Sequence, residues 1–343
     1  MQTPFNAYQL VANGQGNQLQ LAKRILPALG PHEVRIRMAA VSLNYRDLLV
    51  RQGLQGELAP NLIPLSDGAG TIVEIGSAVT DWRVGDRVSP AFFNGWQSGP
   101  YRTAHLVTAL GGGQVDGVLS EEVVANEWAI VAVPDHLSLV EAATLPCAAV
   151  TAWHALFTRG GLQAGETVLI QGTGGVAQFA LQLAVAQKAR VIIISSSDAK
   201  LEQARKLGAW QTINYRQRPD WDAAVLELTD GIGADHVLEL GGPDTYQRSI
   251  GAVAAGGRIA QIGVLTGFGP KPDLLSIQFK NAAINGICVG SVAHYAALNG
   301  FLTQHRIHPV LDRMFEFDEA PAAYDYLAQA GHMGKVVIRL TDD

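Results

Sequence analysis

The sequence predicts an α/β protein in which a doubly wound parallel sheet is inserted into a β-rich domain. Residues 1–148 carry short alternating runs broken by Gly and Pro, whereas residues 149–288 alternate apolar strands with helices. The first pattern returns over 289–343, where Lys335–Leu340 reads KVVIRL. We therefore expect one discontinuous β-rich domain (1–148 and 289–343) around a strand–helix domain (149–288).

Composition excludes several classes of protein. The chain has 343 residues, of which 48% are hydrophobic and 16% are charged, so it can build two cores and is not a disordered chain. Its formal charge is −6, which argues against a nucleic acid or an anionic membrane as partner. The chain has only two cysteines, which excludes a disulfide framework. The N-terminal segment lacks the pattern of a signal peptide, and we expect a cytoplasmic protein.

In the β-rich part, apolar side chains alternate along short runs. Glu33–Met38 reads EVRIRM, which places every second residue on one buried face of a strand. Similar strands are expected at Thr71–Ile75, Asp86–Ser89 and Trp128–Val133. The long loop that contains Gly111–Gly113 is expected at the surface.

The strand–helix part alternates in the way that builds a parallel sheet covered on both faces. The expected strands are Thr167–Gln171, Val191–Ser195, Gln211–Asn214, His236–Leu240, Arg258–Gly263 and Ile284–Val289. The expected helices are Gly175–Lys188, Asp198–Leu207, Asp220–Thr229 and one that ends near Val253.

A phosphate-binding loop is predicted between the first of these strands and its helix. The run Gly172-Thr173-Gly174-Gly175-Val176-Ala177 fits G-x-G-x-x-G/A and stands after a strand and before a helix, as that motif requires. The first glycine permits a sharp turn, the second lets the backbone approach a pyrophosphate, and the helix N-terminus binds the phosphates. The alternative is a structural glycine turn without a ligand.

The tip of the second strand bears on which dinucleotide binds. A carboxylate there usually binds the ribose 2′-hydroxyl of NAD, but this chain has Ser195, Ser196 and Ser197. Three hydroxyls and Lys200 can receive a 2′-phosphate, so we expect NADP(H) to be preferred, with NAD(H) still open. Asp198 is close by, and the serines could instead only cap the next helix.

Several segments resemble the medium-chain dehydrogenase/reductase superfamily, in its zinc-independent branch of quinone oxidoreductase-like and alcohol dehydrogenase-like proteins. They are VSLNYRDLLVRQG (41–53), PLSDGAGTIVEIG (64–76), VGDRV (84–88), LPCAAVTAWHALF (145–157), VLIQGTGGVA (168–177), IGVLTG (262–267) and HMGKVVIRL (332–340). The resemblance implies a GroES-like catalytic domain around an inserted Rossmann domain, with the active site between them. It also implies a homodimer joined near Ile284–Val289.

The same resemblance argues against zinc. The positions of the family's catalytic metal ligands fall here on Asn44, on Ser66 with Asp67, and on Cys147. One thiol cannot make a site that needs three protein ligands, so no metal is expected. Cys147 is then expected to be a small buried apolar residue.

A metal-free hydride transfer suits conjugated acceptors, because a quinone or an α,β-unsaturated ketone spreads the negative charge that develops. Asn44 is the first candidate for the catalytic site, and Tyr45 could bind a carbonyl oxygen or instead pack in the core. Asp67 could line the site or form a salt bridge, and Arg46 with Asp47 is expected to form an ion pair or a helix start.

Further site residues are expected beside these. Phe93 and Trp96 could form apolar walls of a substrate pocket, although aromatic residues are more often core. The resemblance adds a set of cofactor-binding residues, namely Lys200, Tyr215, Gly263, Val264, Leu265, Val289, Gly290, Ser291 and Lys335.

The sequence therefore predicts an NADPH-dependent oxidoreductase that transfers hydride to a conjugated carbonyl of a small molecule without a metal. Two alternatives stay open. One is a zinc-independent alcohol or aldehyde dehydrogenase on the same scaffold, and the other is an NADPH-binding protein without catalytic function.

Overall fold

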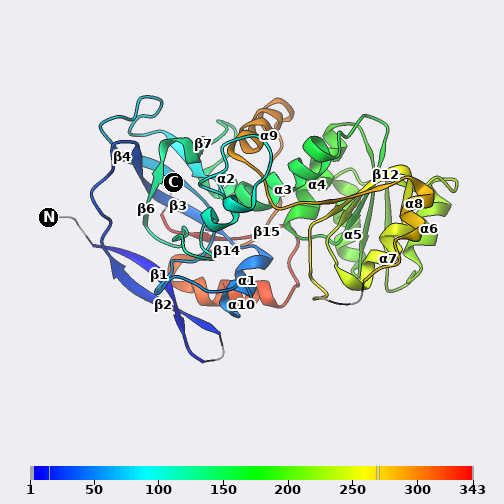
Figure 1. Cartoon of the computed structure of the whole chain (residues 1–343), viewed down its shortest axis with the longest axis horizontal. Coiled ribbons are helices and arrows are strands. Elements are labelled where there is room, and N and C mark those ends of the chain that lie inside the picture. The colour runs from blue at the N-terminus through cyan, green and yellow to red at the C-terminus, as the bar shows by residue number, and fades with distance from the viewer. Residues whose placement is uncertain (1–3, 15, 268, 270, 342–343) are drawn as a thin grey trace. The chain divides into compact units, whose positions relative to one another are not determined.

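The computed structural model describes residues 4–14, 16–267, 269 and 271–341. Its chain forms two compact units (Figure 1). Unit 1 comprises Met1–Val150 and Gly290–Asp343, and unit 2 comprises Thr151–Val289. The chain thus leaves the first unit once and returns to it once.

Unit 1 is built from β-strands with a few short helices. Its strands are β1 (Phe5–Ala12), β2 (Asn17–Arg24), β3 (Glu33–Ser42), β4 (Asp67–Ile75), β5 (Arg87–Pro90), β6 (Glu122–Asn126), β7 (Ile130–Ala132), β14 (Leu311–Glu316) and β15 (Lys335–Arg339). Its helices are α1 (Tyr45–Arg51), α2 (Leu139–Ala142), α9 (Val292–His305) and α10 (Ala320–Ala328), with the short turns η1 (Thr103–Thr108), η2 (Glu127–Ala129), η3 (Leu145–Ala149) and η5 (Phe317–Glu319).

The sheet of unit 1 brings the two ends of the chain together. Its strand order is β14-β15-β3-β4-β5-β7, and β6 pairs with β3 as well. The predicted alternation along β3 is confirmed, because Val34, Ile36 and Met38 have no exposed surface and belong to the core of this unit. The antiparallel pairing of β15 with β3 places the start of β15 next to the end of β3.

Unit 2 alternates strands and helices. Its strands are β8 (Thr167–Gln171), β9 (Arg190–Ser195), β10 (Gln211–Asn214), β11 (Ala234–Glu239), β12 (Val253–Gln261) and β13 (Ala283–Gly286). Its helices are α3 (Val150–Trp153, which starts at the last residue of unit 1), α4 (Gly175–Ala186), α5 (Asp198–Lys206), α6 (Trp221–Leu228), α7 (Pro243–Ala252) and α8 (Leu275–Lys280), with the turn η4 (His154–Arg159).

The described strands of unit 2 form one parallel sheet in the order β10-β9-β8-β11-β12-β13. Strand β8 is buried along its whole length, as a central strand covered by helices on both faces should be. The order of the strands reverses between β8 and β11, and such a switch point opens a crevice at the carboxyl ends of the strands. The predicted α/β class, with a parallel sheet in the middle of a β-rich chain, is confirmed.

Three local expectations were wrong. The strand expected over Ile284–Val289 ends at Gly286, and Val289 has a left-handed φ of 49°, which no strand residue adopts. The run Trp128–Val133 begins with a 3₁₀ turn and is extended only over Ile130–Ala132. The glycine loop is partly buried, because Gly117 passes so close to the Leu65 carbonyl that an added Cβ would lie 1.9 Å from its oxygen.

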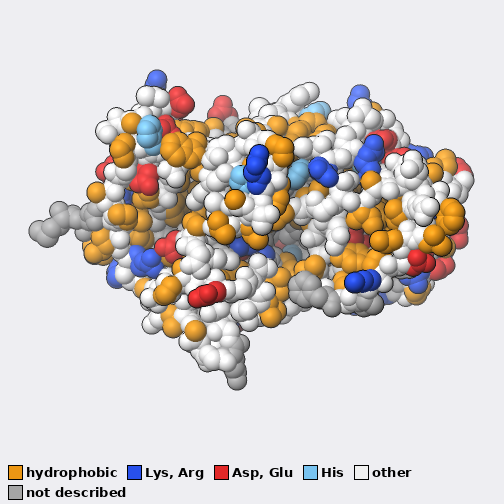
Figure 2. Space-filling model, viewed as in Figure 1, with side chains coloured by type: hydrophobic (Ala, Val, Ile, Leu, Met, Phe, Trp, Pro, Cys, Tyr) orange, Lys and Arg blue, Asp and Glu red, His pale blue; other side chains and the backbone are white. Residues whose placement is uncertain are grey.

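Within the part of the chain that the structure describes, no helix is long and apolar enough to cross a membrane. On the face drawn in Figure 2, acidic and basic side chains are interspersed with apolar ones. That face therefore carries no broad field of one sign.

Candidate functional site

The segment between β3 and α1 holds the side chain of Asn44. Asn44 directly precedes the first turn of α1, and its backbone N–H donates to Oδ2 of Asp47 at 2.7 Å. The backbone N–H of Asp47 in turn donates to the carbonyl oxygen of Asn44 at 3.0 Å. These two hydrogen bonds fix the backbone of Asn44 at the start of the helix.

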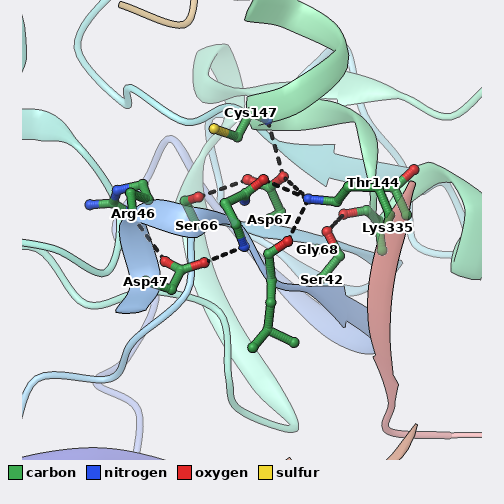
Figure 3. A network of polar contacts seen from close by, with 12 residues as sticks. Ser42, Arg46, Asp47, Ser66, Asp67, Gly68, Thr144, Cys147 and Lys335 are labelled. Carbon is green, nitrogen blue, oxygen red and sulfur yellow. Dashed lines mark hydrogen bonds and ion pairs between the residues drawn. The ribbon is translucent and has the colours of Figure 1, made fainter. Parts of the chain in front are cut away.

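Lys335, the first residue of β15, places its ammonium group beside this segment. Its Nζ donates to the carbonyl oxygen of Leu43 at 2.7 Å and to Oδ1 of Asn44 at 2.5 Å. The same nitrogen lies 3.6 Å from Oδ2 of Asp67, at the start of β4. Figure 3 shows the Lys335 side chain pointing at the Asp67 carboxylate. Only 2% of the Lys335 surface is exposed, so its ammonium group interacts with groups inside unit 1.

Asp67 also binds the two other polar groups of the cluster. Its Oδ1 accepts from the Ser66 hydroxyl at 2.7 Å, and its Oδ2 accepts from the backbone N–H of Cys147 at 3.1 Å. Burial raises the pKa of the Cys147 thiol well above its usual range, and the negative charge of Asp67 raises it further. The thiol is therefore protonated at neutral pH. The structure thus places Asp67 in a buried ion pair, the second of the two roles expected for it.

Arg46 and Asp47 form the expected ion pair at the helix start. Nη1 of Arg46 lies 3.6 Å from Oδ1 of Asp47 and donates to the carbonyl oxygen of Leu110 at 2.9 Å. The guanidinium also lies over the ring of Phe92, 4.8 Å from its centroid. Tyr45, by contrast, is an exposed residue, so packing in the core does not hold its ring.

Phe93 and Trp96 lie in the interior of unit 1, with 0% and 1% of their surface exposed. The indole of Trp96 stacks on His105 with ring centroids 5.6 Å apart and meets the edge of His294 at 5.5 Å. Its Nε1 donates to the carbonyl oxygen of Gly99 at 3.0 Å. A pocket wall formed by these two rings stays a prediction.

In unit 2, the glycine-rich loop has the form that phosphate binding needs. Gly172 has a φ of 76°, which favours glycine, and its N–H donates to the Ile194 carbonyl at 2.7 Å. Helix α4 starts at Gly175, and no side chain caps its first turn among the described residues. The N–H groups of that turn and the positive end of the helix dipole are suited to an anionic ligand. Thr173 and Val176 belong to the same stretch.

The tip of β9 carries serine hydroxyl groups, and α5, which contains Lys200, begins just after it. Oγ of Ser197 accepts from the backbone N–H of Lys200 at 3.5 Å, so Ser197 caps α5 as the alternative reading expected. The Asp198 carboxylate accepts from the amides of Asn214 at 2.7 Å and Gln217 at 3.0 Å. The backbone N–H of Tyr215 donates to the carbonyl oxygen of Ser195, so these two predicted residues are neighbours. Ser196 is half-buried.

The other predicted cofactor residues follow strands of unit 2 or stand where the chain passes from unit 2 back to unit 1. Gly263 follows β12, and an added Cβ would lie 2.0 Å from the Leu240 carbonyl oxygen, so only glycine fits. Val264 is half-buried and Leu265 is exposed just after it. Val289 ends unit 2, and its carbonyl lies 2.7 Å from Nδ1 of the His154 ring. Gly290 is the first residue of the second segment of unit 1. Ser291 follows it, and its hydroxyl caps the N-terminus of α9.

Sequence profiles and relatives identify the family. Residues 30–135 match the alcohol dehydrogenase GroES-like domain, and residues 175–304 match the family described as zinc-binding dehydrogenase. A zinc-type alcohol dehydrogenase-like protein of Schizosaccharomyces pombe is 43% identical over 319 residues, which is 91% of this chain and 92% of that protein. The chain belongs to the medium-chain dehydrogenase/reductase superfamily. It is an oxidoreductase of that superfamily, with a GroES-like unit 1 and a Rossmann unit 2.

Two further proteins are similar over almost the whole chain. The quinone oxidoreductase of Pseudomonas aeruginosa is 32% identical and covers 90% of this chain, with 91% of its own length matched. A Sinorhizobium meliloti protein solved as a candidate alcohol dehydrogenase is 42% identical, with a TM-score of 0.91. That likeness covers 99% of this chain and 100% of the solved one.

Sequence reasoning missed a buried network of this medium-chain dehydrogenase/reductase protein. Glu239, the last residue of β11, has no exposed surface, and its carboxylate accepts from Nε2 of Gln171 at 2.8 Å. It also accepts from the backbone N–H groups of Gly241 and Gly242, both at 2.9 Å. A signal was present, because a carboxylate inside an apolar strand pattern must find donors.

Proposed function

We propose that this protein reduces conjugated carbonyl compounds, quinones or α,β-unsaturated ketones, with NADPH and without a metal ion. The acceptor would take a hydride, and a proton from solvent would complete the reduction, while NADPH would become NADP⁺. The observation that carries the proposal is the polar cluster of unit 1. There, a lysine ammonium is bonded to Asn44 and paired with Asp67.

The donor set of this cluster does not fit a zinc site. Zinc binds thiolates, imidazoles and carboxylates, but among the described residues no group of three or more His, Cys, Asp or Glu side chains could hold a metal ion. The Asp67 carboxylate is already bonded to Ser66, to Cys147 and to an ammonium ion. A divalent ion at the same residues would also be repelled by the ammonium of Lys335. Hydrogen-bond donors are left to stabilise the product anion, and this favours acceptors that delocalise the charge.

The residues of unit 2 fit a dinucleotide. When bound, the reduced nicotinamide supplies the hydride. The backbone of the Gly172–Gly175 loop and the first turn of α4 would hold the pyrophosphate. The tip of β9 supports the choice of NADPH, because the serine hydroxyls and Lys200 can meet a 2′-phosphate there. The nearby Asp198 carboxylate is already bonded to two amide groups.

The first test is consumption of NADPH by purified protein with 1,4-naphthoquinone, with an α,β-unsaturated ketone and with simple aldehydes. We expect turnover with the first two and little with the aldehydes. Faster turnover with aldehydes would favour the zinc-independent alcohol or aldehyde dehydrogenase. The name of the Schizosaccharomyces pombe relative supports alcohol dehydrogenase-like activity, but not the absence of zinc. Binding of NADPH without turnover of any acceptor would favour a non-catalytic binding protein.

Cofactor choice is tested at the tip of β9. We expect Lys200→Glu to weaken NADPH binding at least about tenfold and to leave NADH binding unchanged, because only the 2′-phosphate meets the altered charge. Calorimetric titration with both nucleotides measures this. The matched control is Lys206→Glu, which makes the same charge change at the far end of α5. Equal weakening of NADPH and NADH would contradict the assignment.

A further inference from the structure

The amide of Asn44 has one fixed orientation in unit 1. An ammonium group can only donate, so the atom of Asn44 that lies 2.5 Å from Nζ of Lys335 must be the carbonyl oxygen. The amide nitrogen then points away from Lys335. The hydrogen bonds between Asn44 and Asp47 hold the backbone as well, so neither end of the residue is free to turn.

This arrangement leaves the amide nitrogen of Asn44 without a hydrogen-bond acceptor among the described residues. That nitrogen, Nδ2, is buried. A buried donor without a partner costs free energy, on the order of 1–3 kcal/mol, unless a ligand or water binds it. The buried cation on its carbonyl side also polarises the amide, which makes its N–H groups stronger donors.

We propose that Lys335 is a positioning residue that holds Asn44 so that Nδ2 donates to the carbonyl oxygen of the acceptor as negative charge develops on it. The ammonium thereby serves as the fixed cation of this site. It stabilises the anion through the amide of Asn44, with no contact to the acceptor. This inference rests on the proposed function, and it differs from the cofactor-binding role expected for Lys335 from the family resemblance, which stays a prediction.

Several features of the cluster support this role. The ammonium is bound by the Leu43 and Asn44 oxygens and by the Asp67 carboxylate, all in unit 1, and Lys335 is almost wholly buried. Asp67 itself accepts hydrogen bonds from the Ser66 hydroxyl and the Cys147 N–H (Figure 3). The ammonium is therefore fixed between this carboxylate and the oxygens of Leu43 and Asn44.

The experiment compares three variants of the full-length protein. Asn44→Leu removes the donor, and Lys335→Met with Asp67→Asn removes both buried charges at once, so that neither is left unpaired. The third variant combines all of these changes. Lys280→Met is the matched control, because Nζ of Lys280 also binds backbone carbonyls, those of Ile250, Gly251 and Val253.

With 1,4-naphthoquinone as the probe, we expect the first two variants each to lower kcat about 100-fold, which is the usual effect of losing one such donor. The combined variant should be no slower than Asn44→Leu to within about threefold, because both changes remove the same interaction. NADPH affinity should stay within about threefold of wild type, and Lys280→Met should keep kcat. A charge-free variant with normal kcat, additive losses, or weakened NADPH binding with normal kcat would overturn the proposal.

A second readout does not depend on turnover. Isotope-labelled asparagine gives side-chain amide NMR signals, and Asn44 is assigned by the signal that Asn44→Leu loses. We expect 1,4-naphthoquinone to shift this signal in the wild type and to leave it unshifted in the variant without the two charges. No shift in the wild type would refute the positioning role. Failure of the proposed function would show instead as absent NADPH binding or consumption by the wild type.

Discussion

Asp47 lies wholly inside unit 1 although its side chain is a carboxylate. Burial raises its pKa from 3.8 to about 6, against the opposing effects of the Arg46 guanidinium and of the hydrogen bond from the Asn44 backbone. The folded protein therefore binds a proton at Asp47 more tightly than the unfolded chain does. This stabilisation is fully present below pH 3.8 and is lost as the pH rises through about 6.

We expect Asp47→Asn to remove this pH dependence. A pKa raised from 3.8 to about 6 corresponds to about 3 kcal/mol. The free energy of unfolding of Asp47→Asn, minus that of the wild type, should therefore rise by up to about 3 kcal/mol between about pH 4 and about pH 7. The asparagine keeps an oxygen that accepts from the Asn44 N–H. Urea unfolding of both proteins, followed across this pH range, measures the difference. A difference that stays constant with pH would contradict the assignment.

At the scale of elements, Glu239 ties the end of β11 to the loops that border the switch point of the parallel sheet. Its carboxylate binds Gln171, the residue before the glycine-rich loop, and the backbone of Gly241 and Gly242 before α7. The Gly241 carbonyl accepts in turn from the backbone N–H of Thr266 at 2.9 Å, in the loop after β12. One buried charge thus holds three loops at the carboxyl edge of the sheet.

We expect Glu239→Gln to loosen these loops, because a glutamine amide offers one acceptor oxygen where the carboxylate offers two. Unit 2 should lose about 2–4 kcal/mol of unfolding free energy, and NADPH binding should weaken about tenfold. Denaturant unfolding and calorimetry measure the two effects. Glu227→Gln is the matched control, since Glu227 is an exposed residue of α6 that forms a surface ion pair with Arg218. Equal effects of the two variants would speak against the special role of Glu239.

At the scale of the whole molecule, β13 is the last strand of its sheet, and no described strand pairs with its outer side. An open strand edge exposes unpaired N–H and C=O groups, and a second copy of the same strand can pair with it around a twofold axis. Apolar side chains stand beside this edge, with Phe279 80% exposed and Ile284 39% exposed. Figure 2 shows apolar side chains at the surface where Figure 1 labels α8. We expect a homodimer through β13.

The charged double variant Phe279→Glu with Ile284→Lys should then be a monomer. Sedimentation should give the wild type twice the chain mass of 36.5 kDa and the variant one chain mass. Leu106→Glu alters another exposed apolar residue, in unit 1, and should leave the dimer intact. A monomeric wild type, or a variant that remains a dimer, would contradict this arrangement.

The sequence alone was sufficient for those features that depend on neighbours along the chain. The glycine-rich loop could be predicted because its strand, turn and helix are consecutive, and each needs only local backbone geometry. The alternation of apolar residues likewise determined β3 and the parallel sheet. The sequence did not locate the end of β13, because strand length depends on where pairing with β12 stops.

Only the tertiary structure decided what the polar side chains do. Asn44 and Lys335 are 291 positions apart, and Gln171 and Glu239 are 68 apart, so no local pattern could join them. A buried charge must find its partners wherever the fold brings donors and acceptors together. The pairing of β15 with β3 therefore places Lys335 beside Asn44. The strand order of the parallel sheet likewise places Glu239 beside Gln171, because sheet topology decides which side chains meet.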